Sequence, residues 1–198
     1  TMVGLASGLV LGNLGFTHCC IEDVGILRSI PNISIISPSD SLETVKAVEQ
    51  ALKYHQSCYI RITGGSNNPI INPTDYSFEI GKSITLKKGK DVSIISCGSV
   101  LSECLEAADE LEKKNISTEV VNMHTIKPLD ENKISSILES SKLLVSVEEH
   151  NIIGGLGTAI SEIISSSKQK KPLLRLGVND RYSKSGSYNY LKNFYGLS

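Results

Sequence analysis

The turn GFTHCC at residues 15–20 holds the side chains of this sequence that are best placed to do chemistry. An imidazole at His18 could exchange protons near neutral pH, and a thiolate at Cys19 or Cys20 could act as a nucleophile. A metal site is not expected, because adjacent residues point in different directions and structural zinc uses ligand pairs separated by two to four residues. The other three cysteines are scattered, at Cys58, Cys97 and Cys104. We therefore predict packing roles for Cys19 and Cys20, and no metal.

The position of His18 is more informative than that of its neighbours. It follows Gly12 and Gly15 in a loop that leaves a predicted strand and enters a predicted helix, which is where ligands bind in open α/β sheets. A single histidine without a visible partner can equally be structural. From the local residues alone, both roles stay open.

Composition and charge exclude several classes of protein. The chain has 198 residues, with 20 Lys plus Arg against 21 Asp plus Glu, so no basic field is available to attract nucleic acid. Five cysteines without a framework-like spacing indicate reduced thiols in a cytoplasmic protein. No apolar run reaches membrane-spanning length, and the first residues lack the layout of a signal peptide. The chain begins directly in apolar, glycine-rich sequence, which is typical of an interior starting point.

The first part of the sequence alternates strand and helix patterns. Short β-branched runs bounded by turn residues predict strands, and amphipathic stretches predict helices. The predicted strands are residues 2–7, 33–39 and 58–65, and the predicted helices are residues 21–28 and 42–52. Asp40 or Ser41 can cap the second helix. A strand, a helix and a strand in this order predict a parallel βαβ unit.

A second α/β unit follows a break in this pattern. The stretch GGSNNPIINPTD predicts a linker, taken as residues 65–76, between a unit at residues 1–64 and another at residues 77–198. In the second unit, residues 87–91 predict a hairpin turn between two strands. The later expected elements are helices at 101–114 and 130–141, strands at 117–124, 142–150 and 172–178, and a glycine loop entering a helix at 151–167.

A family resemblance emerges from several stretches together. GFTHCCIEDVGILRSIPNISIISPSDSLET resembles the block G-P-T-H-x-x-I-E-D-x-x-x-x-R-x-I-P-N-x-x-V-x-x-P-x-D of the transketolase family, which closes the pyrimidine-binding domain of these thiamine-diphosphate enzymes. Further similar stretches follow in the family's order: YIRIT, EIGKSITLKKGKDVSIISCGS, HTIKPLD, VEEHNIIGGLGTAISE and NDRYSKSGSYNYLKNFYGL. Together they cover essentially the whole chain.

This resemblance implies an α/β fold class in two parts. Residues 1–64 would be the C-terminal portion of a parallel-sheet pyrimidine-binding domain, and residues 77–198 a separate transketolase C-terminal domain. In the family, thiamine diphosphate and Mg²⁺ are held mainly by a preceding domain, and the glutamate that activates the cofactor lies upstream of this chain. No cofactor ligand is therefore assigned here. We expect a chain that is incomplete without an N-terminal domain or subunit, and that contacts a dimer mate.

Two family roles can be carried over with their residues. His18 matches the histidine of the family's Thr-His motif, which faces the cofactor and hydrogen-bonds substrate oxygens, so its implied role is catalytic. Arg61 matches an arginine that binds the phosphate group of the sugar substrate, a task that suits a guanidinium. The alternative for Arg61 is a surface salt bridge.

The sequence also departs from the family pattern. Many transketolases carry an aspartate that contacts a substrate hydroxyl where this chain has Leu14, and a phosphate-contacting histidine where it has Ala6. In this respect the chain looks more like the short, split transketolase-like proteins. The loss of both contacts puts the ordinary pentose phosphates in doubt as substrates, and a modified or differently phosphorylated sugar becomes plausible, as does an inactive copy.

Two remaining features favour structural roles. The glycines of the loop Gly154 to Gly157 could cradle an anion at a helix N-terminus, but they are more typical of a close backbone approach or a subunit contact. The cluster Glu148, Glu149 and His150 could titrate together, yet at a strand end such a cluster is more often a hydrogen-bonded tie. The final polar, tyrosine-containing stretch is not predicted to bind nucleic acid.

The expected function is that of a C-terminal part or subunit of a transketolase-like enzyme, which moves a two-carbon ketol unit between sugar phosphates. A deoxyxylulose-phosphate synthase or a 2-oxo-acid dehydrogenase β-type subunit is the alternative within enzymes, because both have the same domain order. A non-catalytic assembly module is the alternative outside them. The motif TH…IEDVGILRSIPN fits a transketolase better.

Overall fold

The computed structural model describes residues 1–64 and 68–198. Gly65, Ser66 and Asn67, which end the expected third strand and begin the expected linker, lie outside the described residues. The described remainder of that linker, residues 68–76, forms no helix or strand. The boundaries proposed for the two units stay a prediction.

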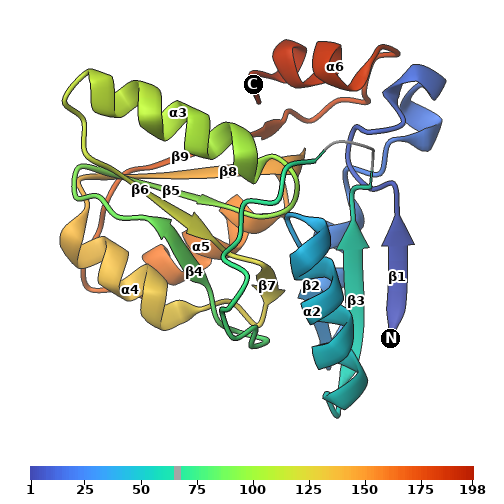
Figure 1. The fold of residues 1–198 in the computed structure, drawn as a ribbon, viewed down its shortest axis with the longest axis horizontal. Coiled ribbons are helices and arrows are strands. Elements are labelled where there is room, and N and C mark those ends of the chain that lie inside the picture. Colours follow the sequence, from blue (N-terminus) through green and yellow to red (C-terminus); the bar gives the residue numbers. More distant parts are fainter. Residues whose placement is uncertain (65–67) are drawn as a thin grey trace.

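The first sheet confirms the expected parallel βαβ arrangement. Strands β1, β3 and β2 are parallel neighbours, and a short strand β7 pairs antiparallel with β2 at the far edge (Figure 1). The strands in their order across the sheet are β1 (Met2–Leu5), β3 (Ser57–Ile62), β2 (Ile33–Ile36) and β7 (Thr125–Lys127). Because β7 comes from the second half of the chain, that half completes a sheet begun by the first.

The second sheet is mixed and mainly parallel. In order across the sheet, its strands are β4 (Ile84–Lys87), β6 (Thr118–Asn122), β5 (Val92–Ser96), β8 (Leu143–Asn151) and β9 (Leu173–Val178). The hairpin predicted at residues 87–91 is wrong, because β4 and β5 both pair with β6, from opposite sides. Every residue of β6 is buried, so its backbone groups need a strand on each side.

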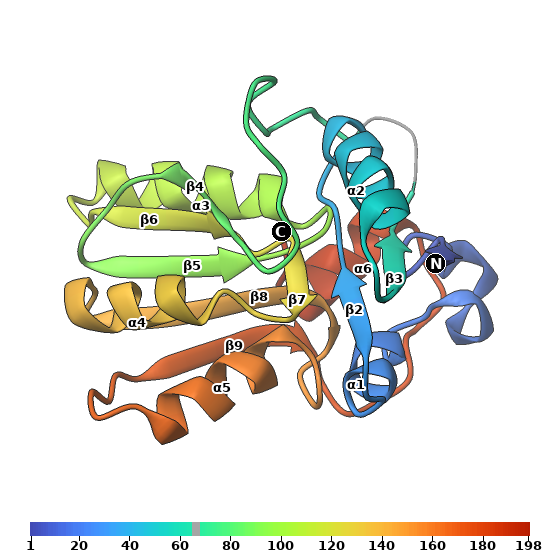
Figure 2. The same ribbon diagram turned by 90° about the horizontal axis from the view of Figure 1, so that it is seen from below.

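In the described part of the chain, six α-helices accompany the sheets: α1 (Asp23–Arg28), α2 (Ser41–Lys53), α3 (Leu101–Lys113), α4 (Glu131–Ser140), α5 (Leu156–Ser166) and α6 (Tyr188–Tyr195). Figures 1 and 2 show α3 on one face of the second sheet and α4 and α5 on the other. The last helix, α6, lies beside the loop that follows β1. It was not predicted, although it is an amphipathic helix capped by Ser187.

Helix α2 begins where the sequence predicts it. The carboxylate of Asp40 accepts a hydrogen bond from the backbone N–H of Glu43 at 2.8 Å, which satisfies one free donor of the first turn. The face turned inward carries the small residues Ala47 and Ala51. Larger apolar side chains point outward, and Leu52 is 79% exposed. The helix therefore presents an apolar outer surface rather than burying its largest residues.

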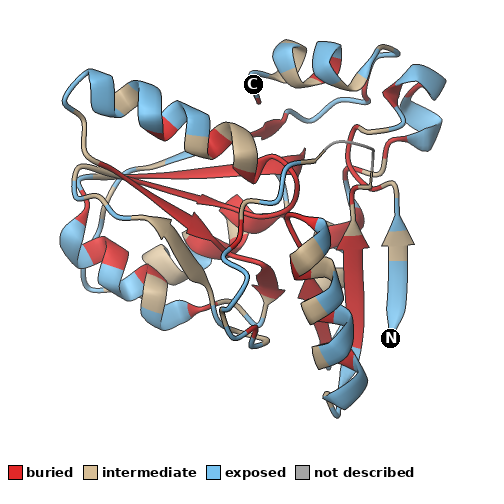
Figure 3. Cartoon of the chain, in the orientation of Figure 1, coloured by how far each residue is buried: buried red, intermediate tan, exposed pale blue. Residues whose placement is uncertain are grey.

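The two sheets share a hydrophobic core. One cluster of buried side chains joins Ile35 and Tyr59 of the first sheet to Ile95, Met123 and Leu144 of the second half. Figure 3 shows that the central strands of both sheets are buried, whereas the edge strand β1 and the outer helix faces are largely exposed. Within residues 1–64 and 68–198, no helix is long and apolar enough to cross a membrane.

Candidate active site

His18 lies on a compact loop between β1 and α1, which we call the His18 loop (residues 6–20). The loop is closed at its base, where the backbone N–H of Gly8 donates to the carbonyl of Cys20 at 2.7 Å. Gly15 has a φ of 85°, a conformation that favours glycine. Between the two ends the chain forms two short 3₁₀ turns, Gly12–Leu14 and Phe16–His18. The closed base makes the loop a single projecting unit.

The imidazole of His18 is exposed at the rim of an open pocket. Its Nδ1 lies 3.0 Å from the hydroxyl of Thr17. Nε2 makes no hydrogen bond to the part of the chain that the structure describes, so it is free to meet a ligand. The pocket has a volume of about 410 Å³, and its apolar surface includes Leu5 and Ala6 at the carboxyl end of β1. This is the position that parallel sheets use for ligands.

The pocket beside His18 draws on both halves of the chain. Phe16 packs against Tyr182, from the segment after β9, with ring centroids 5.0 Å apart. Leu14 is 60% exposed and presents no hydrogen-bond acceptor where the family pattern has an acid. The pocket therefore places His18 among both apolar and polar side chains, the latter including Thr17 and Glu22.

The two cysteines beside His18 are poor nucleophiles. Burial raises the pKa of the thiols of Cys19 and Cys20, which opposes formation of the thiolate. Cys19 is only 7% exposed, and all five thiols of the chain are unpaired. These observations support the packing role predicted for both residues.

Arg61 is buried, and its environment differs from both sequence-based interpretations. Its Nε donates to both carboxylate oxygens of Asp23, at 2.9 and 3.1 Å, and its NH2 group donates to the carbonyl of Glu149 at 2.9 Å. The residue is 3% exposed, so the surface salt bridge is wrong. The phosphate-binding role stays a prediction, and the geometry favours a structural role instead. The partner Asp23 lies 38 residues away, and no sequence pattern pointed to it.

The strand-end cluster of β8 is a set of hydrogen-bonded ties, as the sequence favours. Glu148 accepts the N–H groups of Leu156 and Gly157 at the start of α5, at 2.7 and 2.9 Å. Burial raises the pKa of Glu148 to about 7 and lowers that of His150 to about 4. His150 bonds the carbonyl of Asn151 through Nδ1 at 2.7 Å.

The partners of this cluster connect different parts of the fold. Nε2 of His150 accepts the N–H of Gly25 in α1 at 3.3 Å, so the imidazole is neutral with its proton on Nδ1. Glu149 accepts the N–H of Leu9 in the His18 loop and the hydroxyl of Tyr188 in α6. The end of β8 thus reaches α1, the His18 loop, α5 and α6.

The glycine loop before α5 allows two close approaches. A Cβ atom on Gly154 would lie 2.8 Å from the Cα of Gly25, and one on Gly155 would lie 1.9 Å from the carboxylate of Glu148. The close backbone approach predicted for these glycines is therefore observed. The anion cradle at the helix N-terminus is filled by the chain's own Glu148 carboxylate.

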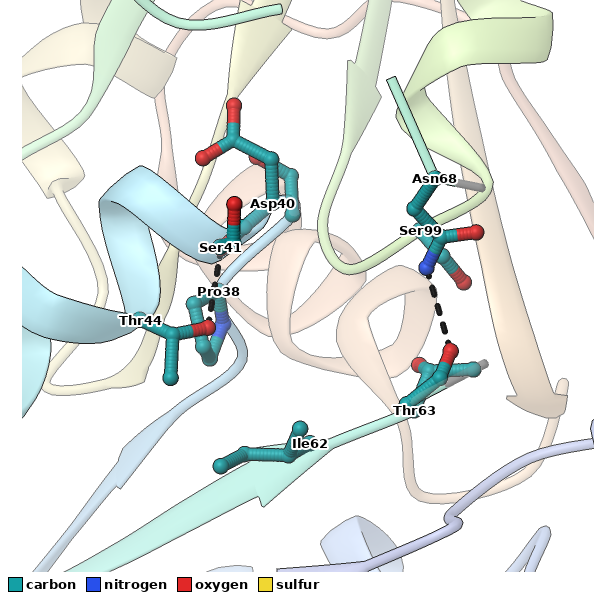
Figure 4. Close-up of a pocket in the computed structure, with 10 residues that line it drawn as sticks. Pro38, Asp40, Ser41, Thr44, Ile62, Thr63, Asn68 and Ser99 are labelled. Carbon is teal, nitrogen blue, oxygen red and sulfur yellow. Dashed lines mark hydrogen bonds between the residues drawn. The ribbon is translucent and has the colours of Figure 1, made fainter. Parts of the chain in front are cut away.

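A second hollow, of about 390 Å³, lies where β2 and β3 end and α2 begins (Figure 4). Its lining includes Asp40, whose second carboxylate oxygen accepts the N–H groups of Ile71 and Asn72. The buried hydroxyl of Thr63 has no partner within the described residues. Because Asp40 is committed to holding the chain, we assign no chemistry to this hollow.

The described residues could form one wall of a cofactor site. His18 and the apolar surface of Leu5 and Ala6 can face a bound ring. Within residues 1–64 and 68–198, no group of three or more His, Cys, Asp or Glu side chains is placed to hold a metal ion.

The fold and the exposed histidine define an α/β protein with its site at the carboxyl ends of parallel strands. Comparison with known families identifies it further. Residues 1–67 match the transketolase pyrimidine-binding domain, and residues 81–198 match the transketolase C-terminal domain. The chain belongs to the transketolase family, whose members depend on thiamine diphosphate.

Individual relatives agree with this family. The chain is 39% identical over 197 residues to a putative transketolase C-terminal section from Methanocaldococcus jannaschii, covering 99% of this chain and 61% of that protein. It is 34% identical over 197 residues to one of the subunits of apulose-4-phosphate transketolase from Actinobacillus succinogenes, covering 99% of this chain and 63% of the relative. The chain therefore spans about three fifths of the length of these curated relatives.

A solved structure shows the same arrangement. A protein described as "Split gene transketolase, inactive beta4 tetramer" superposes with a TM-score of 0.91 at 34% identity. The superposition covers 99% of this chain and 62% of the other. The arrangement of both sheets is thus shared with a split-gene member of the family.

Proposed function

We propose that this chain is the C-terminal part or subunit of a thiamine-diphosphate-dependent transferase that moves a two-carbon ketol unit between sugar phosphates. The observation that carries the proposal is the exposed His18 imidazole, in the family's Thr-His motif, at the carboxyl edge of a parallel sheet. The family match and the split-gene relatives support it. The five unpaired thiols support work in the cytoplasm.

An N-terminal domain or subunit completes this enzyme. It supplies the groups that hold the diphosphate and Mg²⁺, since the described residues offer no such cluster. Exposed apolar side chains support contact with that partner and with a dimer mate, because apolar patches mark interaction surfaces. They include Met2 and Leu5 on β1 and Leu52 on α2, which are 51%, 75% and 79% exposed.

The residues of this chain orient and polarise the substrate. The cofactor, when bound, supplies the carbanion chemistry. His18 donates or accepts a hydrogen bond through the free Nε2, and so stabilises charge that develops on a substrate oxygen. Phe16 lines the same pocket and lies beside the substrate in this proposal.

A mixing experiment tests the function. The purified chain is assayed alone and with its N-terminal partner, with thiamine diphosphate, Mg²⁺, an aldose-phosphate acceptor and, as donors, either a panel of ketose phosphates or pyruvate. We expect ketol transfer in the mixture only, and its loss when the His18→Ala chain is used. Activity of the chain alone would contradict the need for a partner. Turnover with pyruvate but not with ketose donors would favour a deoxyxylulose-phosphate synthase, and inactivity with the correct partner would favour an assembly module.

A further inference from the structure

The His18 loop is fastened to the C-terminal half of the chain at several points. Leu9 is completely buried and packs in a cluster with Val178 and Leu191, and the N–H of Gly186 donates to the carbonyl of Gly12 at 3.0 Å. These contacts hold the side of the loop opposite to His18. The loop that carries the candidate catalytic histidine is thus supported by residues more than 150 positions away in the sequence.

The most polar of these fastenings is the buried carboxylate of Glu149. One of its oxygens accepts the N–H of Leu9, and the other accepts the hydroxyls of Tyr188 at 2.6 Å and Ser99 at 3.1 Å. The residue is 3% exposed. A carboxylate with donors from the loop, α6 and the β5–α3 turn holds these three elements in one geometry.

The surrounding backbone leaves little room for this carboxylate to move. A Cβ atom on Gly8 would lie 2.3 Å from an oxygen of Glu149, so the loop backbone passes directly over it. The carbonyl of Glu149 accepts the guanidinium of Arg61, which also donates to the carbonyl of Cys20 at the other end of the loop. One end of the His18 loop therefore bonds Glu149 directly, through Leu9, and the other end is connected to it through Arg61.

We propose that Glu149 is a positioning residue, which sets the placement of His18 by holding the base of the His18 loop, with Tyr188 as its second partner. This inference rests on the proposed function, in which His18 contacts the substrate. Burial raises the pKa of the Glu149 carboxyl, and the hydrogen bonds from Tyr188 and Leu9 oppose that rise.

A matched pair of tyrosine variants tests the proposal in the complete enzyme. Tyr188→Phe removes one donor to Glu149, whereas Tyr195→Phe removes from the same helix a buried hydroxyl that has no partner within the described residues. We expect Tyr188→Phe to lower kcat about tenfold with little change in KM, as loss of a hydrogen bond to a charged group would. Tyr195→Phe should leave kcat unchanged.

A double-variant cycle separates positioning from general stability. If Tyr188 acts through His18, then Tyr188→Phe should cause no further loss in a His18→Ala enzyme. Losses that multiply in the double variant would overturn the proposal. So would equal effects of the two tyrosine variants.

Hydrogen exchange gives a readout that does not depend on activity. Amides of residues 7–20, measured by mass spectrometry in the complete protein, should exchange faster in Tyr188→Phe and Glu149→Gln than in the unaltered protein. Their exchange rates in Tyr195→Phe should be unchanged. Unaltered exchange in the first two variants would overturn the role of Glu149. An enzyme without ketol transfer would instead overturn the proposed function, while the exchange rates would still decide whether Glu149 holds the loop.

Discussion

His18 and His150 both lie near strand ends, His18 in the loop after β1 and His150 in the last residues of β8, and their surroundings are opposite. His18 is exposed beside an open pocket, with Thr17 as its hydrogen-bond partner. His150 is 2% exposed, and both of its nitrogens are bonded to backbone groups. Each has titratable neighbours in sequence, Cys19 and Cys20 in one case and Glu148 and Glu149 in the other. A histidine near a strand end becomes a candidate for chemistry only where the surrounding elements leave a nitrogen free.

The difference follows from what covers each strand end. The end of β8 lies between the two halves of the chain, so its side chains meet α1, α5, α6 and the His18 loop. Residues after β1 instead project as a loop that is closed at its base and open at its tip. The covered end of β8 therefore stabilises the packing of these elements, whereas the open loop after β1 is available to a ligand.

The largest expected effect concerns the covered region. Replacing Arg61 by Met should lower the free energy of unfolding by about 3–5 kcal/mol, because Asp23 would remain as an unpaired buried charge. The measurement is urea denaturation of the chain. Lys113→Met is the control, since both members of its ion pair are exposed and its loss should change the stability little. An unchanged stability with a raised KM for phosphorylated donors would restore the phosphate role of Arg61.

The open region should respond in activity rather than in stability. His18→Ala in the complete enzyme should lower kcat by about 10²- to 10³-fold, through the loss of a hydrogen bond to developing charge. Its thermal midpoint should match that of the unaltered protein, because the side chain is exposed. Steady-state kinetics and calorimetry check the two expectations, and an enzyme with intact turnover would refute the role given to His18.

A pH series sharpens the contrast further. The pKa of His150 falls from 6.5 to about 4 on folding, so the unfolded chain binds more protons than the folded chain between these values. His150 therefore lowers stability as the pH falls from about 6.5 to 4. The thermal midpoint of His150→Gln minus that of the unaltered protein should therefore increase as the pH is lowered from about 6.5 to 4. Buried His124, whose pKa is also lowered to about 4, acts equally in both proteins and cancels in the comparison.

The smallest expected effect is at Leu14, an exposed residue of the His18 loop. Leu14→Asp should change the free energy of unfolding by no more than about 0.5 kcal/mol, because the side chain is largely exposed. It should raise kcat/KM by about tenfold for donors that present a hydroxyl to this position, as one added hydrogen bond would. Competition between two ketose phosphates measures this change. An equal fall in kcat/KM with every donor would show that Leu14 does not face the substrate.

Much of the fold could be predicted from local patterns. The alternation of apolar strands with amphipathic helices predicted β2, β3, α2, α3, α4 and β8, and Asp40 caps α2 as expected. The sequence analysis did not predict strand β7, because three residues are too few to show a strand pattern. It also did not predict helix α6, because the composition of that segment is polar. The order of β4, β6 and β5 was also missed, since strand pairing depends on contacts between distant segments.

What the sequence alone determined was the local chemistry: a Thr-His turn after a strand, the family pattern that extends along the chain, and an apolar residue at position 14 in place of an acid. The tertiary structure decided which polar groups are free. Arg61 and Asp23 are distant in sequence but paired in the interior, and Glu149 holds a loop 140 residues away. Burial and pairing arise only when separate elements pack together, because a side chain's solvent and partners are properties of its surroundings and not of its neighbours along the chain.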